Sequence, residues 1–317
     1  MLCRRDAFRH ACGTLGALAR LNGVMSIFLT GATGYIGSAV LRQLRLQGRD
    51  VTALVRTVDK AAKIEALGAT AVIGDLRDAE LLTEQAIASD GVIHLASPGD
   101  DSSRDVDDAV VTAILAGLEG SDKRYVHTGG IWVWGDNDAI DEDSPQSPPA
   151  LTAWRGEIER RVLDAQGVST SLIAPGIVFG HNAGIPRILV DAGGDSGVVR
   201  LIGDGSQHWT TVYVDDLAEL YILALDLGSA GSTYIGASGE NPTVREIGEA
   251  AAAGQGLDAR VETSSVEETR ERLGEQFADA LLLDQQARGS KARIDLGWEP
   301  NGPTLLEELR TGSYAKR

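Results

Sequence analysis

The sequence feature that most constrains the fold is a short apolar run, Ser26–Thr30, and the three glycines that follow it. These glycines, Gly31, Gly34 and Gly37, are spaced three residues apart. A helical alternation of apolar and polar residues follows at once, so the segment predicts a strand, a tight turn and a helix. Gly31 lacks a Cβ and can adopt the backbone conformation that the turn requires. Gly34 lets the main chain approach a pyrophosphate, and Gly37 lets the helix pack against the strand. The helix start then offers N–H groups and a positive dipole end to phosphates, although a glycine-rich turn without a ligand remains the alternative.

Strand-like and helical patterns alternate after this motif. Short apolar segments occur at Asp50–Val55, Ala71–Ile73, Val92–Leu95 and Arg124–Thr128, and helical patterns separate them. Such β-α repetition predicts a parallel sheet that is covered by helices, with right-handed crossovers. We therefore expect an α/β protein with a Rossmann-type, doubly wound parallel sheet.

The second half of the chain has a different pattern. The loop Gly129–Gly135 is rich in tryptophan, and an acidic, proline-containing segment follows it. A helix is expected over Leu151–Gln166 and an aromatic strand over Gln207–Val214. We expect residues 25–174 to form mainly a dinucleotide-binding core. Residues 175–317 should form mainly a smaller C-terminal substrate-binding lobe, interleaved with the last elements of the core.

Charge and cysteine content exclude several classes of function. The chain of 317 residues carries a net charge of −17, which argues against nucleic acid and anionic membrane surfaces as partners. No apolar run of the sequence is long enough to cross a bilayer. Both cysteines, Cys3 and Cys12, precede the first strand, so no disulfide framework and a cytoplasmic location are expected. Metal binding has no support from the sequence, because the body has no cysteine and no histidine pair at ligand spacing.

Residues 1–24 differ from the rest of the chain. Four arginines make this segment basic, and its apolar stretch Leu15–Leu21 is too short and interrupted for a good secretory signal. An arginine-rich targeting peptide is one interpretation. We favour a dispensable extension, because Met25 stands directly before the first strand.

The residue after the second strand indicates the cofactor. In a dinucleotide-binding fold, an acidic residue here binds the ribose 2′-hydroxyl of NAD, whereas an arginine accommodates the 2′-phosphate of NADP. Arg56 occupies this place, the first carboxylate is Asp59, and Lys60 and Lys63 lie close in sequence. The sequence therefore favours NADP and leaves NAD open, with a solvated Arg56 as the alternative. Asp75, after the third strand, either stands near an adenine or caps the next helix.

Several segments occur in the order typical of one enzyme family. They are Thr30–Gly37, Gly74–Leu76, His94–Ala96, Ala174–Gly180, Val212–Ala218 and Leu296–Pro300. Over residues 25–315 the chain resembles an extended or atypical short-chain dehydrogenase/reductase of the NAD-dependent epimerase/dehydratase family. The resemblance implies a bound nicotinamide cofactor and a carbonyl or sugar-like substrate. Together with the motif, it implies cofactor contacts from Gly31, Thr33, Gly34, Tyr35, Ile36, Gly37, Arg56, Asp75, Leu76, Leu95, Ala96, Ser97, Thr128, Arg155, Pro175, Ile177 and Val178.

The catalytic residues of this family are replaced in the chain. Gly130 stands where the family has its catalytic serine, and Leu151 stands where it has its catalytic tyrosine. The family's lysine, which lowers the pKa of that tyrosine and holds the nicotinamide ribose, corresponds to Arg155. An arginine can still donate hydrogen bonds to a ribose, but it cannot carry a proton near neutral pH. No tyrosine occurs between Tyr125 and Tyr213, so a local shift of this alignment would not restore the missing proton donor.

Four residues remain as candidates for the missing catalytic groups. Tyr213 has an ionisable hydroxyl, and His181 follows the segment that usually lines the substrate pocket in the family. Thr128 could orient a carbonyl, and Arg155 could hold the nicotinamide ribose. A packing role is the alternative for each. The tryptophans of this half either wall an apolar pocket or pack the second lobe.

The leading hypothesis is an NADP(H)-dependent oxidoreductase that reduces a small carbonyl-type metabolite and uses an unusual proton donor. One alternative is a non-catalytic dinucleotide-binding sensor or scaffold. The other is a nucleotide-sugar-type epimerase or dehydratase. The expected partner is a small-molecule substrate, with no nucleic acid and no membrane, and a homodimer is left open.

Overall fold

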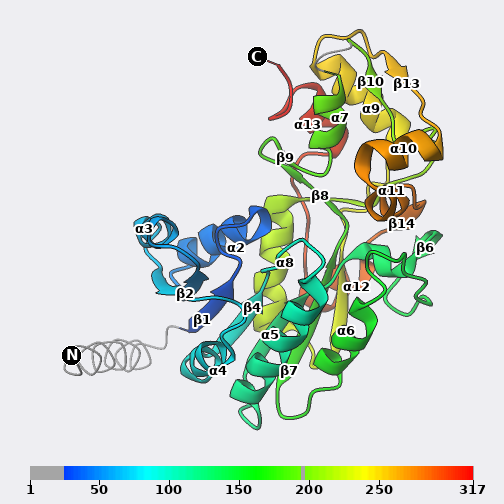
Figure 1. Ribbon diagram of the computed structural model, residues 1–317. Helices are drawn as coiled ribbons and strands as arrows, with labels where there is room; N and C mark the ends of the chain where they lie inside the picture. Colours follow the sequence, from blue (N-terminus) through cyan, green and yellow to red (C-terminus); the bar gives the residue numbers. More distant parts are fainter. Residues whose placement is uncertain (1–24, 194–196, 317) are drawn as a thin grey trace. The chain divides into compact units, whose positions relative to one another are not determined.

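The computed structural model of the protein describes residues 25–193 and 197–316 (Figure 1). The dispensable extension expected over residues 1–24 lies outside this part of the chain. Within it, no helix combines the length and the apolar character that a membrane span requires.

The chain forms two compact units, and neither is a continuous stretch of sequence. Unit 1 comprises the described residues up to His127 together with Val162–Ser171 and Ser229–Gly231. Unit 2 comprises the remaining segments, Thr128–Arg161, Leu172–Gly228 and Ser232 onwards. The division at residue 174 that the sequence suggested stays a prediction.

The central sheet has seven strands. Their order is β12 (Ser232–Gly236), β7 (Ser169–Pro175), β5 (Arg124–Thr128), β4 (Gly91–His94), β1 (Ser26–Thr30), β2 (Asp50–Val55) and β3 (Thr70–Ile73). In unit 1 the pairs β1–β2, β2–β3, β1–β4 and β4–β5 are all parallel. The order reverses direction at β1, from which β2 and β3 extend one way and β4 and β5 the other. This arrangement confirms the predicted α/β fold with a Rossmann-type, doubly wound parallel sheet.

The helices of unit 1 bury apolar side chains, and the central strand β1 is buried on both faces. The helices are α2 (Tyr35–Leu46), α3 (Val58–Ala66), α4 (Ala79–Ala88) and α5 (Ser103–Leu118). Helix α2 buries its apolar face, including Val40, Leu41 and Leu44, and lies beside β1 and β2 (Figure 1). The side chains of Ile27, Phe28 and Leu29 in β1 are fully buried. Burial on both faces is what a central parallel strand requires, and it makes β1 a rigid support for the turn that follows it.

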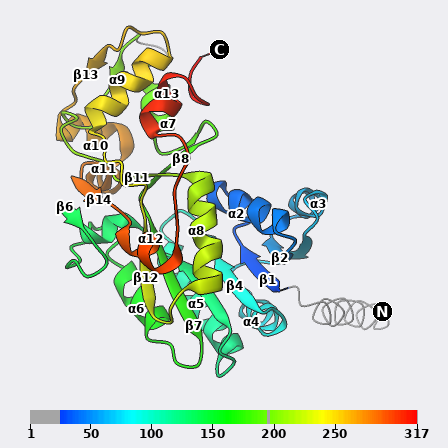
Figure 2. The same cartoon turned by 180° about the vertical axis from the view of Figure 1, so that it is seen from behind.

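Unit 2 contains many short elements. They are η1 (Ile131–Trp134), β6 (Asn137–Ile140), α6 (Arg155–Leu163), β8 (Ile177–Gly180), β9 (Ala183–Gly184), α7 (Arg187–Ala192), β10 (Val199–Arg200), β11 (Thr211–Tyr213), α8 (Val214–Leu227), α9 (Val244–Gly254), β13 (Val261–Glu262), α10 (Val266–Leu273), α11 (Glu275–Leu281), β14 (Gln285–Ala287), α12 (Ser290–Leu296) and α13 (Leu305–Arg310). Strand β8 pairs with β11 in parallel and with β9 in antiparallel orientation. Helices α7, α9 and α13 lie side by side (Figures 1 and 2).

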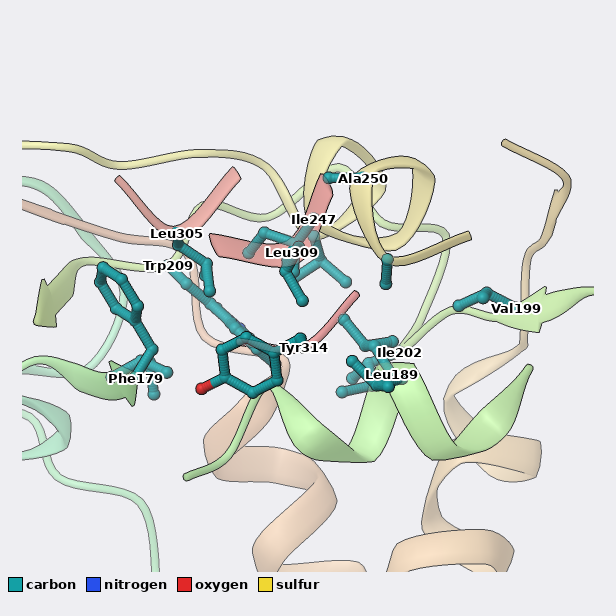
Figure 3. Packing of buried hydrophobic residues seen from close by; sticks show 14 of the residues in the cluster. Phe179, Leu189, Val199, Ile202, Trp209, Ile247, Ala250, Leu305, Leu309 and Tyr314 are labelled. Atoms are coloured by element: carbon teal, nitrogen blue, oxygen red, sulfur yellow. The ribbon is translucent and has the colours of Figure 1, made fainter. Parts of the chain in front are cut away.

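An apolar cluster holds this part of unit 2 together. Side chains from β8, α7, α9 and α13 belong to one cluster with Trp209, and Figure 3 shows Phe179, Leu189, Ile247 and Leu309 among its members. Each of these side chains is nearly or fully buried. Burying a large apolar side chain contributes about 1.5–3 kcal/mol, so this cluster is a principal source of stability for unit 2.

Two predicted elements are shorter than the sequence suggested. The helix expected over Leu151–Gln166 begins only at Arg155, because the backbone before it forms a turn in which the amides of Thr152 and Ala153 both donate to the Pro149 carbonyl at 3.0 Å. The strand expected over Gln207–Val214 is limited to β11. The amide of His208 donates to the Asp284 carboxylate at 2.8 Å. A side chain therefore accepts the hydrogen bond that the backbone carbonyl of a neighbouring strand would accept in a sheet.

Candidate active site

The glycine turn after β1 is shaped by contacts that leave no room for side chains. Gly31 has φ +77°, in the left-handed region, and a Cβ there would lie 2.7 Å from the carbonyl carbon of Leu95. A Cβ on Gly37 would lie 2.0 Å from the Gly31 carbonyl oxygen. The turn can therefore form only with glycine at both places, and the sequence prediction for the two residues matches this geometry.

Thr30 ties this turn to the end of β4. Its Oγ1 lies 3.2 Å from the amide of Leu95 and 3.4 Å from the amide of Ala96, and both amides donate to it. The same oxygen lies 2.6 Å from Nδ1 of His94. Because Oγ1 already accepts two hydrogen bonds, its own proton is directed to Nδ1. Nε2 of His94 lies 3.1 Å from the Asp107 carboxylate.

A pocket of about 320 Å³ opens at this end of the unit 1 strands. The predicted cofactor contacts that line it are Gly31, Thr33, Gly34, Arg56, Asp75, Leu76, Leu95, Ala96 and Ser97. Tyr35, Ile36 and Gly37 form the first turn of α2. The other predicted contacts, Thr128, Arg155, Pro175, Ile177 and Val178, belong to unit 2 and do not line this pocket.

Some of the charged side chains that line the pocket have polar partners within the protein, and others do not. Arg77 is engaged, since its Nη1 lies 3.6 Å from Asp75 and its Nη2 donates to the Ser102 hydroxyl at 3.0 Å. Asp100 accepts hydrogen bonds from the hydroxyl and the amide of Ser102, which hold the pKa of this exposed carboxyl below its usual value. Arg56 and Lys60 line the same pocket, and their side chains form no polar contact within the described part of the chain.

The residues present fit a dinucleotide. The glycine turn leaves a backbone cradle that any Cβ would fill, and Gly34 at the start of α2 provides no side-chain cap for the helix amides. The first turn of α2 also has no acidic residue that would repel a phosphate. A pyrophosphate is the group that such amides and such a helix dipole bind.

A second group of predicted residues meets in unit 2. The Thr128 hydroxyl, at the end of β5, lies 2.9 Å from the Tyr221 hydroxyl of α8. Nη1 of Arg155, the first residue of α6, donates to the Thr128 carbonyl at 3.3 Å. The guanidinium also stacks over the Trp154 ring, 4.7 Å from its centroid. These contacts hold Arg155 beside Thr128.

Tyr221 is a member of this group that the sequence did not indicate. It occupies a buried position on a helix of otherwise aliphatic spacing, a pattern that predicts core packing. Burial raises the pKa of the Tyr221 hydroxyl, whereas the bond to Thr128 and the charge of Arg155 lower it less strongly. The hydroxyl therefore remains protonated across the physiological pH range.

The two glycines after β5 differ in the space around them. A Cβ on Gly129 would lie 2.7 Å from Oε1 of Glu159, whose side chain is buried. A Cβ on Gly130 would meet no atom within 4 Å in the described structure, and its φ of −177° is extended backbone that any residue adopts. The position of the family's serine is thus sterically open here.

The other two predicted catalytic residues lie together elsewhere in unit 2. Nε2 of His181 is 2.9 Å from Oδ2 of Asp215, and the His181 ring lies 5.8 Å from the Tyr213 ring. A Cβ on Gly180 or on Gly302 would approach the Tyr213 ring to 2.5 Å, so glycine backbone packs closely against the ring on two sides. This enclosure matches the packing alternative for Tyr213, whereas His181 is half exposed and oriented by a carboxylate.

A buried histidine pair in unit 1 was also missed from sequence. His94 and His127 are register partners on β4 and β5, their rings stack at 5.5 Å, and both face the Asp107 carboxylate. Their side-chain ligand atoms and that of Asp107 lie within 4.8 Å of one another, as in a metal site. Residues 33 positions apart give no spacing signal, and only the pairing of the strands brings them together.

Comparison of the sequence with known proteins identifies the family of this chain. The sequence profile of the "NAD dependent epimerase/dehydratase family" matches residues 27–236. An uncharacterized protein of Schizosaccharomyces pombe is 34% identical over 92% of this chain and 100% of its own length. A 4-hydroxy-2-methyl-3-oxo-4-farnesyl-3,4-dihydroquinoline-1-oxide ketoreductase of Stigmatella aurantiaca is 28% identical over 85% of each chain.

Solved structures show the same fold. A dTDP-glucose 4,6-dehydratase of Streptomyces venezuelae, with NAD bound, superimposes with a TM-score of 0.74. It is 23% identical, and the match covers 91% of this chain and 96% of the dehydratase. Fold and glycine turn thus define a dinucleotide-binding α/β protein. The chain belongs to the NAD dependent epimerase/dehydratase family, and the family together with its reductase relatives identifies it as an NAD(P)-dependent oxidoreductase.

Proposed function

We propose that the protein is an NADP(H)-dependent reductase of a small carbonyl-type metabolite. The observation that carries the cofactor choice is a pair of cations, Arg56 directly after β2 and Lys60 in the first turn of α3. Arg56 and Lys60 both line the nucleotide pocket, and neither side chain has a polar partner within the described residues. A 2′-phosphate would supply that partner, and charge-assisted bonds to a phosphate are about twice as strong as neutral ones.

Reduction is favoured over other reactions of the family by the groups in unit 2. An epimerase or dehydratase needs a group that takes a proton from the substrate and returns it. The fully buried Tyr221 keeps its proton, and Arg155 cannot exchange one near neutral pH. A reduction needs only a donor that polarises the carbonyl, which a hydroxyl provides. The ketoreductase relative from Stigmatella aurantiaca supports the same reaction class.

Arg155 would keep the ribose-binding half of the family lysine's role. Its guanidinium has five N–H donors, and the Thr128 carbonyl accepts from one of them at 3.3 Å. The remaining donors suit the hydroxyls of a nicotinamide ribose at every accessible pH. The proton-carrying half of the lysine's role is absent, because an arginine stays charged.

The test is NADPH oxidation by the purified protein across a panel of aldehydes, ketones and 3-oxo compounds, followed at 340 nm. We expect turnover with at least one compound, and slower turnover with NADH than with NADPH. Cofactor titration without any carbonyl compound runs in parallel. Tight binding of NADPH with no turnover on the whole panel would contradict the reductase and favour a cofactor-bound sensor.

A further inference from the structure

Two loops that line the nucleotide pocket come from strands that are not neighbours in the sheet. Pocket residues 74–77 follow β3, and pocket residues 95–98 and 100 follow β4. The sheet order places β1 and β2 between these two strands, so three strand spacings, about 14 Å, separate β3 from β4. The two loops therefore flank the ends of β1 and β2, which lead into the glycine turn and to Arg56.

The side chain of Arg77 connects these two loops. Its Nη2 donates to the Ser102 hydroxyl at 3.0 Å, and the Ser102 hydroxyl lies 2.6 Å from Oδ1 of Asp100. Asp100 is ionised at neutral pH, because the bonds from Ser102 hold its pKa below the usual value. A guanidinium has only donors and an ionised carboxylate has only acceptors, so the direction of both bonds is fixed. Arg77 donates to Ser102, and Ser102 donates to Asp100.

The first loop holds Arg77 in place for this bond. Nη1 of Arg77 lies 3.6 Å from Oδ1 of Asp75, and the same oxygen accepts from the Arg77 amide at 3.0 Å. The Asp75 carbonyl accepts from the amide of Asp78, the N-cap residue of α4, at 3.1 Å. The guanidinium therefore extends from a turn that is itself hydrogen-bonded, and it reaches the second loop from there.

Polar bonds, and not packing, hold the tip of the second loop. Gly99 and Asp100 are exposed, and a Cβ on Gly99 would meet no atom within 4 Å in the described structure. The Asp100 carboxylate also accepts from the Ser102 amide at 2.9 Å. Contacts between exposed charged and polar groups are weak, because water competes for them. The connection between the two loops can therefore open while the sheet below it stays folded.

We propose that the Arg77–Ser102 hydrogen bond is a latch across the adenosine end of the nucleotide pocket, and that its opening limits how fast the dinucleotide enters and leaves. Arg56 marks the adenosine end, because the residue after the second strand faces the adenosine ribose in this fold class. The latch acts on the part of the cofactor that NADP and NAD share. It is independent of the reaction that the bound cofactor then carries out.

The experiment measures the rates of binding and release of NADPH and NADH by stopped-flow fluorescence. Ser102→Ala removes the acceptor of Arg77 and leaves the residues that line the pocket unchanged. We expect both rates to rise about fivefold for both cofactors, the usual effect of one lost hydrogen bond. The Kd should change less than about twofold, because a latch alters the barrier in both directions. Ser102→Thr retains the hydroxyl and should keep the wild-type rates.

Arg77→Met tests the other end of the latch, because it keeps the length of the side chain and removes its donors. We expect the same rise in both rates. Faster release alone, with a higher Kd, would show that Arg77 binds the cofactor directly, and it would overturn the latch. The matched control is Ser121→Ala, since the Ser121 hydroxyl donates to the Leu118 carbonyl at the opposite end of α5. It should leave both rates unchanged.

A second measurement needs neither cofactor nor substrate. Amide hydrogen exchange of residues 97–103 reports how often the second loop opens. We expect exchange about fivefold faster in Ser102→Ala and Arg77→Met than in the wild type, Ser102→Thr and Ser121→Ala. Equal exchange in all five proteins, or unchanged binding and release rates in Ser102→Ala and Arg77→Met, would overturn the latch. A protein that shows the expected rates but reduces no carbonyl compound would contradict the reductase and leave the latch intact.

Discussion

Unit 1 and unit 2 keep the family pattern to different degrees. In unit 1 the glycine motif is complete, and at Gly31 and Gly37 any Cβ would lie within 2.7 Å of backbone atoms. In unit 2 the expected alignment puts Gly130 and Leu151 where the family has its serine and tyrosine, and the Tyr221 hydroxyl of α8 lies 2.9 Å from the Thr128 hydroxyl. The glycine turn is a site made of backbone atoms, so it tolerates only glycine at these positions. A site made of side-chain hydroxyl groups tolerates more change, because a different helix or strand can provide the hydroxyl group.

The largest expected effect comes from breaking the backbone site. Gly37→Ala places a methyl group 2.0 Å from the Gly31 carbonyl oxygen. The turn must shift, so we expect loss of detectable NADPH binding and a stability loss of about 3 kcal/mol or more. Cofactor titration and thermal unfolding measure the two effects.

Gly130→Ala is the control for this substitution, because its Cβ meets no atom within 4 Å in the described structure and its backbone is extended. It should bind NADPH as the wild type does. If Gly37→Ala also bound NADPH normally, unit 1 would be as tolerant as unit 2, and the contrast between them would be lost.

A smaller effect is expected from the side-chain part of the nucleotide pocket. Arg56→Asp removes a charge-assisted phosphate contact, which is worth about 1.5–3 kcal/mol, or about 10- to 150-fold in Kd. NADH binding should change far less, since NADH has no 2′-phosphate. The measurement is the Kd of both cofactors by fluorescence titration.

Lys63→Asp makes the same charge reversal on the exposed end of α3, outside the residues that line the pocket. It should leave the preference for NADPH in place. Equal weakening of NADPH and NADH by Arg56→Asp would show that this residue does not contact the 2′-phosphate.

The smallest expected effect sharpens the comparison within unit 2. Gly130→Ser introduces the family's serine into open space, so stability should stay within about 0.5 kcal/mol of wild type. Gly129→Ser brings a Cβ to 2.7 Å from the buried Glu159 carboxylate and should cost about 1–3 kcal/mol. Urea unfolding compares the two. A Gly130→Ser variant as unstable as Gly129→Ser would mean that packing, not relocation of the hydroxyl, excludes the family's serine.

The fold could be predicted because its determinants are local. The apolar run Ser26–Thr30 and the glycines after it specify strand, turn and helix within a dozen residues, and the later strands repeat the pattern. Boundaries were less predictable. The backbone bonds to Pro149 and the Asp284 carboxylate that shorten two elements depend on local turn geometry and on a contact 76 residues away in sequence.

The residues of the candidate site also differ in how well the sequence predicts them. The pocket residues around Arg56 and Asp75 follow strand ends, which a sequence pattern marks. Tyr221 was not predictable, because its hydroxyl meets Thr128 across 93 positions of sequence and its own helix has the pattern of a core helix. The His94–His127 pair shows the same limit, since strand pairing alone creates it.

The discontinuous make-up of unit 1 has a consequence for synthesis of the chain. Its last segment, Ser229–Gly231, is synthesised only after the two unit 2 segments Thr128–Arg161 and Leu172–Gly228. Gly231 donates to the Thr170 carbonyl, so the edge of the parallel sheet in this unit is completed late. Domains usually fold as units during translation, from the N-terminus onwards. Here the nucleotide-binding unit is complete only when this short segment has been synthesised, and until then the Thr170 carbonyl lacks its Gly231 donor.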